Sequence, residues 1–435
     1  MSIKRYSWGR YPDFPQTPYT CSWRDGLGAV VASAAAQGTT LGYGNGRSYG
    51  DSCLAESDRV VQMAAINRFI EVDWQRGVVV AEAGITLGEI LAASIPRGWF
   101  LSVTPGTQFV TLGGAVANDV HGKNHHNRGS FSTCVNRFGL LRAGESLVCS
   151  LADNPHLFAA TIGGLGLTGI IAWVEIQLRP VISSQIDTHT RRFDNLTEFF
   201  DLSRELDPQH EYSVAWVDCL ASGQARGRGV YMGADHAVYG DLAVERPVNR
   251  RLPFSPPVSL VNSFSLRAFN SAYWHRHSAK ISQRRTGYQS FFYPLDSVLY
   301  WNRIYGNKGF QQYQCVVPDA EAEPAMDELL KIIANAREGS FLAVLKRCGN
   351  TPSSGLLSFP MPGFSLALDF PHKAELEPLF SRLDAVVREA RGRLYPAKDA
   401  HMSGDDFRTA YPAWEQLEAL RDPLLMSRFW KRVSL

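Results

Sequence analysis

Three glycine-rich loops constrain the fold of this chain more than any other feature of its sequence. They span residues 42–50, 104–114 and 163–169, and short apolar runs separate them. Alternating glycines allow successive backbone N–H groups to converge into a concave nest that binds an anion. A single glycine cluster is usually a turn, but three clusters among short strands favour a site for the pyrophosphate of a nucleotide cofactor.

The apolar runs between these loops predict short helices and strands. The predicted helices cover residues 28–37 and 86–94, and the predicted strands cover residues 39–41, 59–63, 77–83 and 170–178. Thr86 has the position of a helix cap, and Pro96 ends the same helix. This part of the chain therefore mixes helices and strands around the glycine loops.

Beyond about residue 181 the composition becomes more polar and aromatic, which predicts a separate domain that faces the substrate. Its predicted strands cover residues 212–217, 309–317 and 364–370, and its predicted helices cover residues 323–337 and 375–391. The last forty residues follow a turn at 395–399 and have a helical pattern.

A G-x-G-x-x-G match at Gly164, Gly166 and Gly169 does not predict a nicotinamide site. The dinucleotide fingerprint requires a preceding strand and a following helix, whose N-terminus meets the pyrophosphate. Here the match runs directly into the strand pattern at 170–178. The glycines are therefore interpreted as a turn that feeds a strand.

Histidines follow the second glycine loop, at positions 121, 125 and 126. His121 and His125 have the i, i+4 spacing of a metal pair, but Gly122 argues against the helix that would direct both rings at one ion. No H-E-x-x-H motif and no carboxylate cluster accompanies them. We expect no metal site here, and we expect His121 to be structural or to lie beside the cofactor.

Charge and cysteine content exclude several classes of protein. Lys and Arg number 44 against 42 Asp and Glu, which gives a net charge of +2 and no global field that would attract nucleic acid. The seven cysteines form no C-x-x-C pair, which favours a reducing compartment. The longest uncharged stretch, residues 157–174, contains four glycines and suits a turn and a strand better than a membrane span. We expect a cytoplasmic protein without a secretory signal, at most peripheral to the inner face of the membrane.

Residues 246–295 differ from the rest of the chain. They contain no Asp or Glu, whereas arginines, lysine, prolines and aromatic residues are frequent. Such a segment suits either an anionic lipid surface or a solvated loop over the substrate domain. Both interpretations remain open at this point.

Several motifs together resemble the decaprenylphosphoryl-β-D-ribose 2'-oxidase group of the vanillyl-alcohol-oxidase (PCMH-type) flavoproteins. The motifs are GNGRSYGD at 44–51, TPGT at 104–107, TLGGAVANDVHGKNHH at 111–126, GGLGLTGII at 163–171, YPLD at 293–296, GFQQYQ at 309–314, SFPMPGF and LDFP within 358–371, and RLYPAKD at 393–399. The resemblance implies an α+β fold with a two-subdomain FAD-binding domain and a substrate domain built on an antiparallel sheet. It places the FAD domain at 1–180, the substrate domain at 181–389 and a segment that returns to the FAD domain at 390–435.

The resemblance also implies how FAD is held. Many relatives attach FAD covalently through a histidine, but the corresponding position here is Tyr49, which has no imidazole nitrogen for that bond. We therefore predict non-covalent FAD. The residues expected to contact it are Gly44, Asn45, Gly46, Arg47, Ser48, Tyr49, Gly106, Thr111, Leu112, Gly113, Gly114, Asn118, His121, Ile171 and Tyr395.

On the substrate side, the resemblance implies catalytic roles for Lys398, His121 and Tyr293. Lys398 is the expected group that polarises or deprotonates the reacting hydroxyl. The residues expected to bind the substrate are Gln312, Gln314, Lys346 and Trp216.

The resemblance predicts an oxidoreductase that acts on the 2'-hydroxyl of polyprenylphosphoryl-β-D-ribose. The 2'-keto product would be the first half of an epimerisation to the arabinose form, in arabinan and cell-wall biosynthesis. The expected partners are a short-chain reductase that acts on the product, a quinone-type electron acceptor and, through residues 246–295, the membrane surface. The alternative is an aldonolactone or sugar-alcohol oxidase with a soluble substrate.

Overall fold

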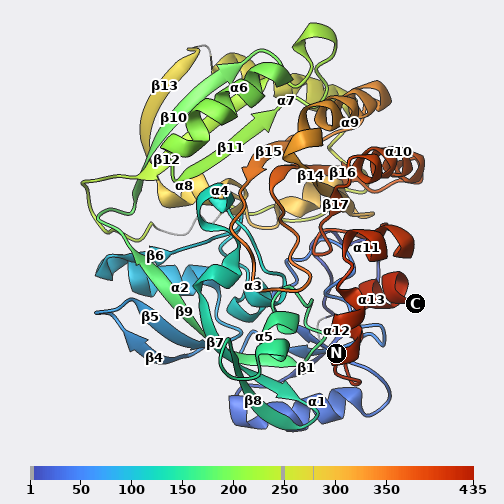
Figure 1. Ribbon diagram of the computed structural model, residues 1–435. Coiled ribbons are helices and arrows are strands. Elements are labelled where there is room, and N and C mark those ends of the chain that lie inside the picture. The colour runs from blue at the N-terminus through green and yellow to red at the C-terminus, as the bar shows by residue number, and fades with distance from the viewer. Residues whose placement is uncertain (1–3, 246–249, 278) are drawn as a thin grey trace.

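The computed structural model describes residues 4–245, 250–277 and 279–435, which form two packed parts (Figure 1). The strands of the N-terminal part are β1 Thr17–Thr20, β2 Leu41–Tyr43, β3 Arg59–Gln62, β4 Phe69–Asp73, β5 Val78–Glu82, β6 Trp99–Leu101, β7 Val135–Arg142, β8 Glu145–Ser150 and β9 Ile170–Pro180. A parallel three-stranded sheet has the order β1-β3-β2. An antiparallel six-stranded sheet has the order β4-β5-β9-β7-β8, with β6 paired to the end of β9.

Short helices cover these two sheets. They are α1 Leu27–Ala35, α2 Leu87–Ser94, α3 Leu112–Ala117, α4 His125–Arg128 and α5 Pro155–Thr161. At the start of α2, the Thr86 side chain accepts from the Glu89 N–H while the Glu89 carboxylate accepts from the Thr86 N–H. This reciprocal capping satisfies two backbone donors that a helix start otherwise leaves free. The predicted cap at Thr86 is confirmed.

The second part is built on an eight-stranded sheet of order β13-β10-β12-β11-β15-β16-β14-β17, antiparallel throughout. Its strands are β10 Gln185–Phe193, β11 Tyr212–Val217, β12 Gly229–His236, β13 Ile281–Gly287, β14 Phe310–Pro318, β15 Val344–Cys348, β16 Gly363–Pro371 and β17 Arg393–Leu394. Its helices are α6 Leu196–Leu206, α7 Ser263–Arg276, α8 Tyr288–Phe292, α9 Ala322–Ala336 and α10 Leu376–Glu389. The expected α+β class and antiparallel substrate sheet are confirmed.

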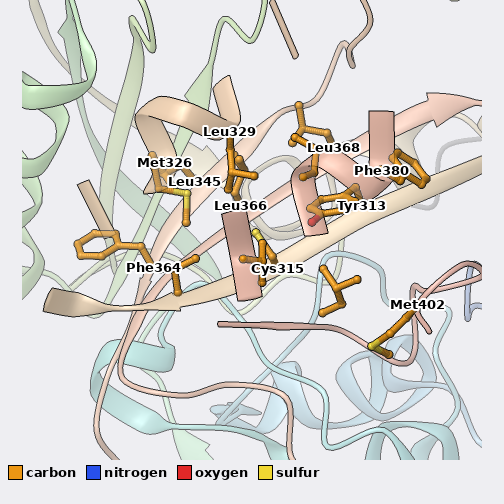
Figure 2. Close-up of a cluster of buried hydrophobic side chains, with 14 of the residues drawn as sticks. Tyr313, Cys315, Met326, Leu329, Leu345, Phe364, Leu366, Leu368, Phe380 and Met402 are labelled. Atoms are coloured by element: carbon orange, nitrogen blue, oxygen red, sulfur yellow. The ribbon is translucent and has the colours of Figure 1, made fainter. Parts of the chain in front are cut away.

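The two faces of this sheet have different neighbours because successive side chains in a strand point to opposite sides. On one face Tyr313 and Cys315 of β14 pack with Leu366 and Leu368 of β16 against α9 and α10 (Figure 2). Burying a leucine in such a core stabilises the fold by about 1.5–3 kcal/mol. The other face of the same strands is left for the site.

The C-terminal segment joins both parts. It contains α11 Gly404–Ala410, α12 Trp414–Leu420 and α13 Arg428–Ser434. Thr40 bridges Leu425 and Ala55 bridges Ser427, while β17 pairs with β14 in the large sheet. The chain therefore runs from the large sheet back along the first glycine loop.

The segment 246–295 contains folded elements in place of a simple loop. The helices α7 and α8 and the strand β13 lie within it. Residues 246–249 and 278 lie outside the described residues. In the part of the chain that the structure describes, no helix is long and apolar enough to cross a membrane.

Candidate active site

A cavity of about 540 Å³ separates the glycine loops from the open face of the large sheet. The loops at 42–49, 104–107 and 111–114 form one wall, and residues of β11, β14, β15 and β16 form the other. Successive side chains of a strand point to opposite faces of the sheet, which explains which residues form the second wall. Gln312, Gln314 and Lys346 line the cavity, while their neighbours Tyr313 and Leu345 belong to the core behind the sheet.

The first glycine loop offers a row of unused backbone donors. The N–H groups of Asn45, Gly46, Arg47 and Ser48 donate no hydrogen bond to any described residue. Since buried backbone N–H groups are almost always paired, a row of free ones at a cavity wall fits an anionic ligand. This geometry matches the nest predicted from the alternating glycines.

The loop cannot exchange these glycines for larger residues. Gly46 has φ +58°, and a Cβ there would lie 2.0 Å from the Tyr43 hydroxyl. A Cβ on Gly44 would lie 2.3 Å from Thr111 Oγ1, so the first loop packs directly on the second. Gly106 meets nothing within 4 Å, which leaves its backbone open to the cavity.

Three buried polar side-chain atoms beside the cavity also have no partner among the described residues. They are the Ser52 hydroxyl, Arg47 Nε and His121 Nδ1. Leaving such a group unsatisfied costs about 1–3 kcal/mol. A polar ligand that fills the cavity would satisfy these atoms, which is the behaviour expected of a cofactor site.

His121 is held as a neutral ring. Burial and the neighbouring Lys346 charge lower the pKa of His121 far below its usual range. Gln314 Nε2 lies 3.2 Å from His121 Nε2. With the amide as donor, the ring proton lies on Nδ1, the atom without a partner.

Lys398 lies where the two walls meet. Two backbone hydrogen bonds fix the turn that carries Lys398. The Tyr395 N–H donates to the Gln314 carbonyl (2.9 Å), and the Tyr49 N–H donates to the Ala397 carbonyl (3.0 Å). The Lys398 ammonium lies 3.4 Å above the centre of the Tyr49 ring. The C-terminal turn thus carries this lysine between the glycine loop and the sheet.

Burial also changes the acidity of Lys398 and of nearby Asp369. Removal from water lowers the pKa of Lys398, and the charge of Asp369 partly opposes that change. Burial raises the pKa of Asp369, whose Oδ1 accepts a hydrogen bond from Gln312 Nε2 at 2.6 Å. Lys398 is therefore an amine that can release and accept a proton near neutral pH.

Two further lysines lie on the cavity wall. Lys346 donates to the Gly122 carbonyl at 2.9 Å, and burial lowers its pKa to about 8. Lys123 donates to the Phe291 carbonyl, and burial lowers its pKa to about 7. Backbone carbonyls fix both side chains, and in their protonated forms they place positive charge on one side of the cavity.

Most of the residues predicted from the sequence surround this one cavity. Those that line it are Gly44, Asn45, Gly46, Arg47, Ser48, Tyr49, Gly106, Thr111, Gly113, Gly114, Asn118, His121, Ile171, Trp216, Gln312, Gln314, Lys346, Tyr395 and Lys398. Some have engaged polar groups: Asn118 Nδ2 donates to the Gly114 carbonyl, and Trp216 Nε1 donates to the Phe341 carbonyl. These two side chains present their remaining surface to the cavity.

Two predicted residues do not line the cavity. Leu112 is the first residue of α3, and its side chain packs in the core of the N-terminal part. Tyr293 is buried, and its hydroxyl lies 2.6 Å from Thr104 Oγ1. The same YPLD motif supplies Asp296, which accepts from Thr107 Oγ1 and from the Gln108 N–H. Tyr293 therefore fixes the second glycine loop and does not face the reacting space.

Sequence reasoning missed Asp369, Lys123 and Trp8. Trp8 lines the cavity under the Arg47 guanidinium, which lies 4.0 Å from its ring. Asp369 had a detectable signal, since it is an isolated acid in the apolar run of β16. Lys123 and Trp8 are far in sequence from their partners, so only the fold brings them to the cavity.

Among the residues with described positions, no group of three or more His, Cys, Asp or Glu could hold a metal ion.

Comparison with known proteins identifies the cofactor domain. A family described as "FAD binding domain" matches residues 24–150. This range contains the first two glycine loops, including the free N–H groups of Asn45 to Ser48 in the first. The cofactor is FAD. The glycine loops at 42–49, 104–107 and 111–114, which we call the cradle, fit such a group. The unpartnered Ser52 hydroxyl and His121 Nδ1 fit it as well.

The similarity extends along the whole chain. The chain is 33% identical to decaprenylphosphoryl-beta-D-ribose oxidase of Mycolicibacterium smegmatis, over 96% of this chain and 94% of that protein. It belongs to this family of FAD-dependent oxidoreductases. An uncharacterized protein of Streptomyces coelicolor is 35% identical over 78% of this chain and 95% of its own length. L-gulonolactone oxidase of Scyliorhinus torazame is 30% identical over only 39% of each chain.

The family membership confirms the expected class of enzyme, an FAD-dependent oxidoreductase that acts on a CH–OH group. The cradle would hold the FAD phosphates. The wall formed by residues of β11, β14, β15 and β16, which we call the sheet wall, would hold the alcohol that donates the electrons.

Proposed function

We propose that this enzyme oxidises the 2'-hydroxyl of a polyprenylphosphoryl-β-D-ribose to the 2'-keto sugar, the first half of an epimerisation to the arabinose form. The observation that carries the proposal is the position of Lys398, a desolvated amine at the junction of the cofactor cradle and the polar sheet wall. Similarity to decaprenylphosphoryl-beta-D-ribose oxidase over 96% of the chain supports the substrate class.

In the proposed reaction, Lys398 accepts the proton of the 2'-hydroxyl. When bound, FAD supplies the acceptor for the hydride that leaves the carbinol carbon. The lowered pKa of Lys398 provides a neutral amine at a pH where an exposed lysine would be protonated. The charge of nearby Asp369 favours the resulting ammonium.

Other wall residues bind and orient the donor. Gln312 and Gln314 present amide groups to the cavity and suit the hydroxyls of a sugar ring. The ammonium groups of Lys346 and Lys123 would attract the phosphate that joins sugar and lipid. Trp216 adds an apolar surface beside them.

We also propose that FAD is bound without a covalent bond. Tyr49 lies at the cavity wall, where its ring contacts the Lys398 ammonium and lies 5.3 Å from the ring centre of Phe310. Burial raises the pKa of its phenol, so it stays protonated and is a poor nucleophile. Backbone donors of the cradle would then hold the cofactor.

The proposed chemistry requires two partners. The keto sugar needs a reductase that returns hydrogen to the opposite face, a step for which a short-chain reductase is suited. The reduced cofactor needs an electron acceptor, and we propose a quinone, since the substrate itself is a lipid.

Anaerobic reduction of the FAD-loaded enzyme tests the proposal. Farnesylphosphoryl-β-D-ribose should bleach the flavin absorbance, and L-gulono-1,4-lactone should not. Bleaching by the lactone alone would refute the proposal and support the alternative, an oxidase for a soluble substrate. The partial similarity to L-gulonolactone oxidase is the observation behind that alternative. No bleaching by either compound would refute both functions.

A further inference from the structure

An exposed surface next to the cavity has no role in the reaction. It comprises the apolar side chains of Phe254, Val258, Leu260 and Phe264 and the basic side chains of Arg250, Arg251 and Arg267. We call this surface the basic rim. It belongs to segment 246–295, which contains no Asp or Glu.

One helix connects the basic rim to the cavity wall. Phe264 and Arg267 lie on α7, and the same helix places Phe269 and Tyr273 in the cavity lining. Residues 252–260, which precede α7, are hydrogen-bonded to residues 299–304, and this second stretch contains another cavity-lining residue, Trp301. The Leu252 N–H donates to the Leu299 carbonyl (3.1 Å), and the Leu260 N–H donates to the Ile304 carbonyl (2.8 Å).

The apolar side chains of the basic rim are unusually exposed for their size. Phe264 is 81% exposed, Phe254 71% and Val258 69%. Single exposed apolar residues are common, but neighbouring ones on one segment mark a binding surface. Water is thus in contact with an apolar surface directly beside a cavity that would receive a lipid-linked sugar.

The charges of the basic rim are also unpartnered. Arg250, Arg251 and Arg267 form no ion pair with any described residue. By contrast, Lys280 pairs with Glu198 at 3.2 Å and Arg285 with Asp187 at 2.7 Å, farther along the segment. Because residues 246–295 contain no Asp or Glu, the rim has no internal neutralisation. Free arginines among exposed aromatic residues complement an anionic bilayer.

We propose that the basic rim docks on an anionic lipid bilayer, with its apolar side chains in the boundary between headgroups and acyl chains and its arginines on lipid phosphates. The inference rests on the proposed function in one respect. The polyprenyl chain of the substrate would remain near the bilayer and pass along Phe269 and Tyr273, while its sugar enters the cavity.

Flotation of the FAD-loaded enzyme with vesicles, without substrate, tests the docking. The enzyme should float with vesicles of phosphatidylcholine and phosphatidylglycerol, but not with phosphatidylcholine alone, and high salt should weaken the binding. An Arg250→Glu, Arg251→Glu, Arg267→Glu variant and a Phe254→Ser, Val258→Ser, Phe264→Ser variant should each bind about tenfold more weakly or worse. None of these residues lines the cavity, so flavin content should not change.

Matched substitutions elsewhere serve as controls. Leu151→Ser removes another exposed apolar side chain, and Arg382→Glu reverses another exposed charge. Wild-type binding by both controls is expected. Failure of the wild-type enzyme to float with anionic vesicles, or equal loss in controls and rim variants, would overturn the docking.

Two further outcomes separate this inference from its alternatives. Flotation without any bleaching by the farnesyl substrate would leave the docking standing and refute only the proposed function. If sedimentation shows a dimer that the Phe254, Val258 and Phe264 substitutions convert to a monomer, and vesicles do not bind, the surface pairs two copies of the chain and the docking is refuted.

Discussion

The two walls of the cavity are built by different means. The cradle wall presents backbone N–H groups from loops in which Gly46 and Gly44 have no room for a side chain. The sheet wall presents the side chains of every second residue on strands whose other residues, such as Tyr313, fill the core. The cradle thus depends on backbone shape, and the sheet wall depends on chemical identity.

This difference predicts how each wall responds to substitution. A change in the cradle should weaken FAD binding, since it removes the geometry of several donors at once. A change in the sheet wall should leave FAD in place and slow the chemistry or weaken donor binding.

Lys398→Met should have the largest effect, because it removes the proposed base. We expect the rate of anaerobic flavin reduction by farnesylphosphoryl-β-D-ribose to fall about 10³-fold, with flavin content unchanged. Lys398→Arg keeps the charge but cannot lose its proton near neutral pH, so it should be nearly as slow. A variant that bleaches at the wild-type rate would remove Lys398 from the mechanism.

Gly46→Ala should weaken FAD binding by about 10- to 100-fold, because the residue has φ +58° and its Cβ would meet the Tyr43 hydroxyl. Gly28→Ala is the matched control, since a Cβ at this position in α1 meets nothing within 4 Å. Fluorescence titration of the apo proteins with FAD measures both affinities. Equal affinities of the two variants would contradict the backbone cradle.

Gln314→Leu should raise the KM for the sugar donor or slow reduction by about tenfold, because His121 Nε2 loses its donor at 3.2 Å. Gln311→Leu, on the same strand, is the control. Gln311 does not line the cavity, and its amide contacts His372. Steady-state kinetics with both variants measures the difference. The same loss in both would mean that the strand acts only through stability.

The pH profile of flavin reduction should show the smallest effect. The active form of Lys398 is the free amine, so the rate should rise with pH and level off below the pKa of an ordinary lysine. Asp369→Asn removes the charge that favours the ammonium, so the pKa of Lys398 falls further and the profile moves to lower pH. A shift to higher pH would show that Asp369 acts in another way.

The two walls also differ in how well the sequence predicts them. The alternating glycines predict the anion nest directly, and the free N–H groups of Asn45 to Ser48 agree with that prediction. Local patterns likewise predict α2, β9 and β11, because periodicity and caps are short-range signals. The ends of some predicted elements differ from the structure by a few residues. The strand predicted from residue 39, for example, is β2, which begins at Leu41.

Residues of the sheet wall are harder to predict. Nothing local indicates that Lys398 meets Tyr49 or that Gln314 meets His121, since these contacts join residues far apart in the chain. Resemblance to a family located them, and it also included Tyr293, whose hydroxyl instead bonds Thr104. Long-range packing alone decides which polar residues reach the cavity.

The central claim is that a backbone cradle, and not a covalent bond at Tyr49, holds FAD in front of Lys398. An absorbance spectrum of the purified protein, taken before and after denaturation and filtration, tests it most directly. We predict a flavin spectrum in the native protein and FAD in the filtrate after denaturation. Flavin that remains on the polypeptide would contradict the claim, and so would a colourless protein that FAD cannot reconstitute.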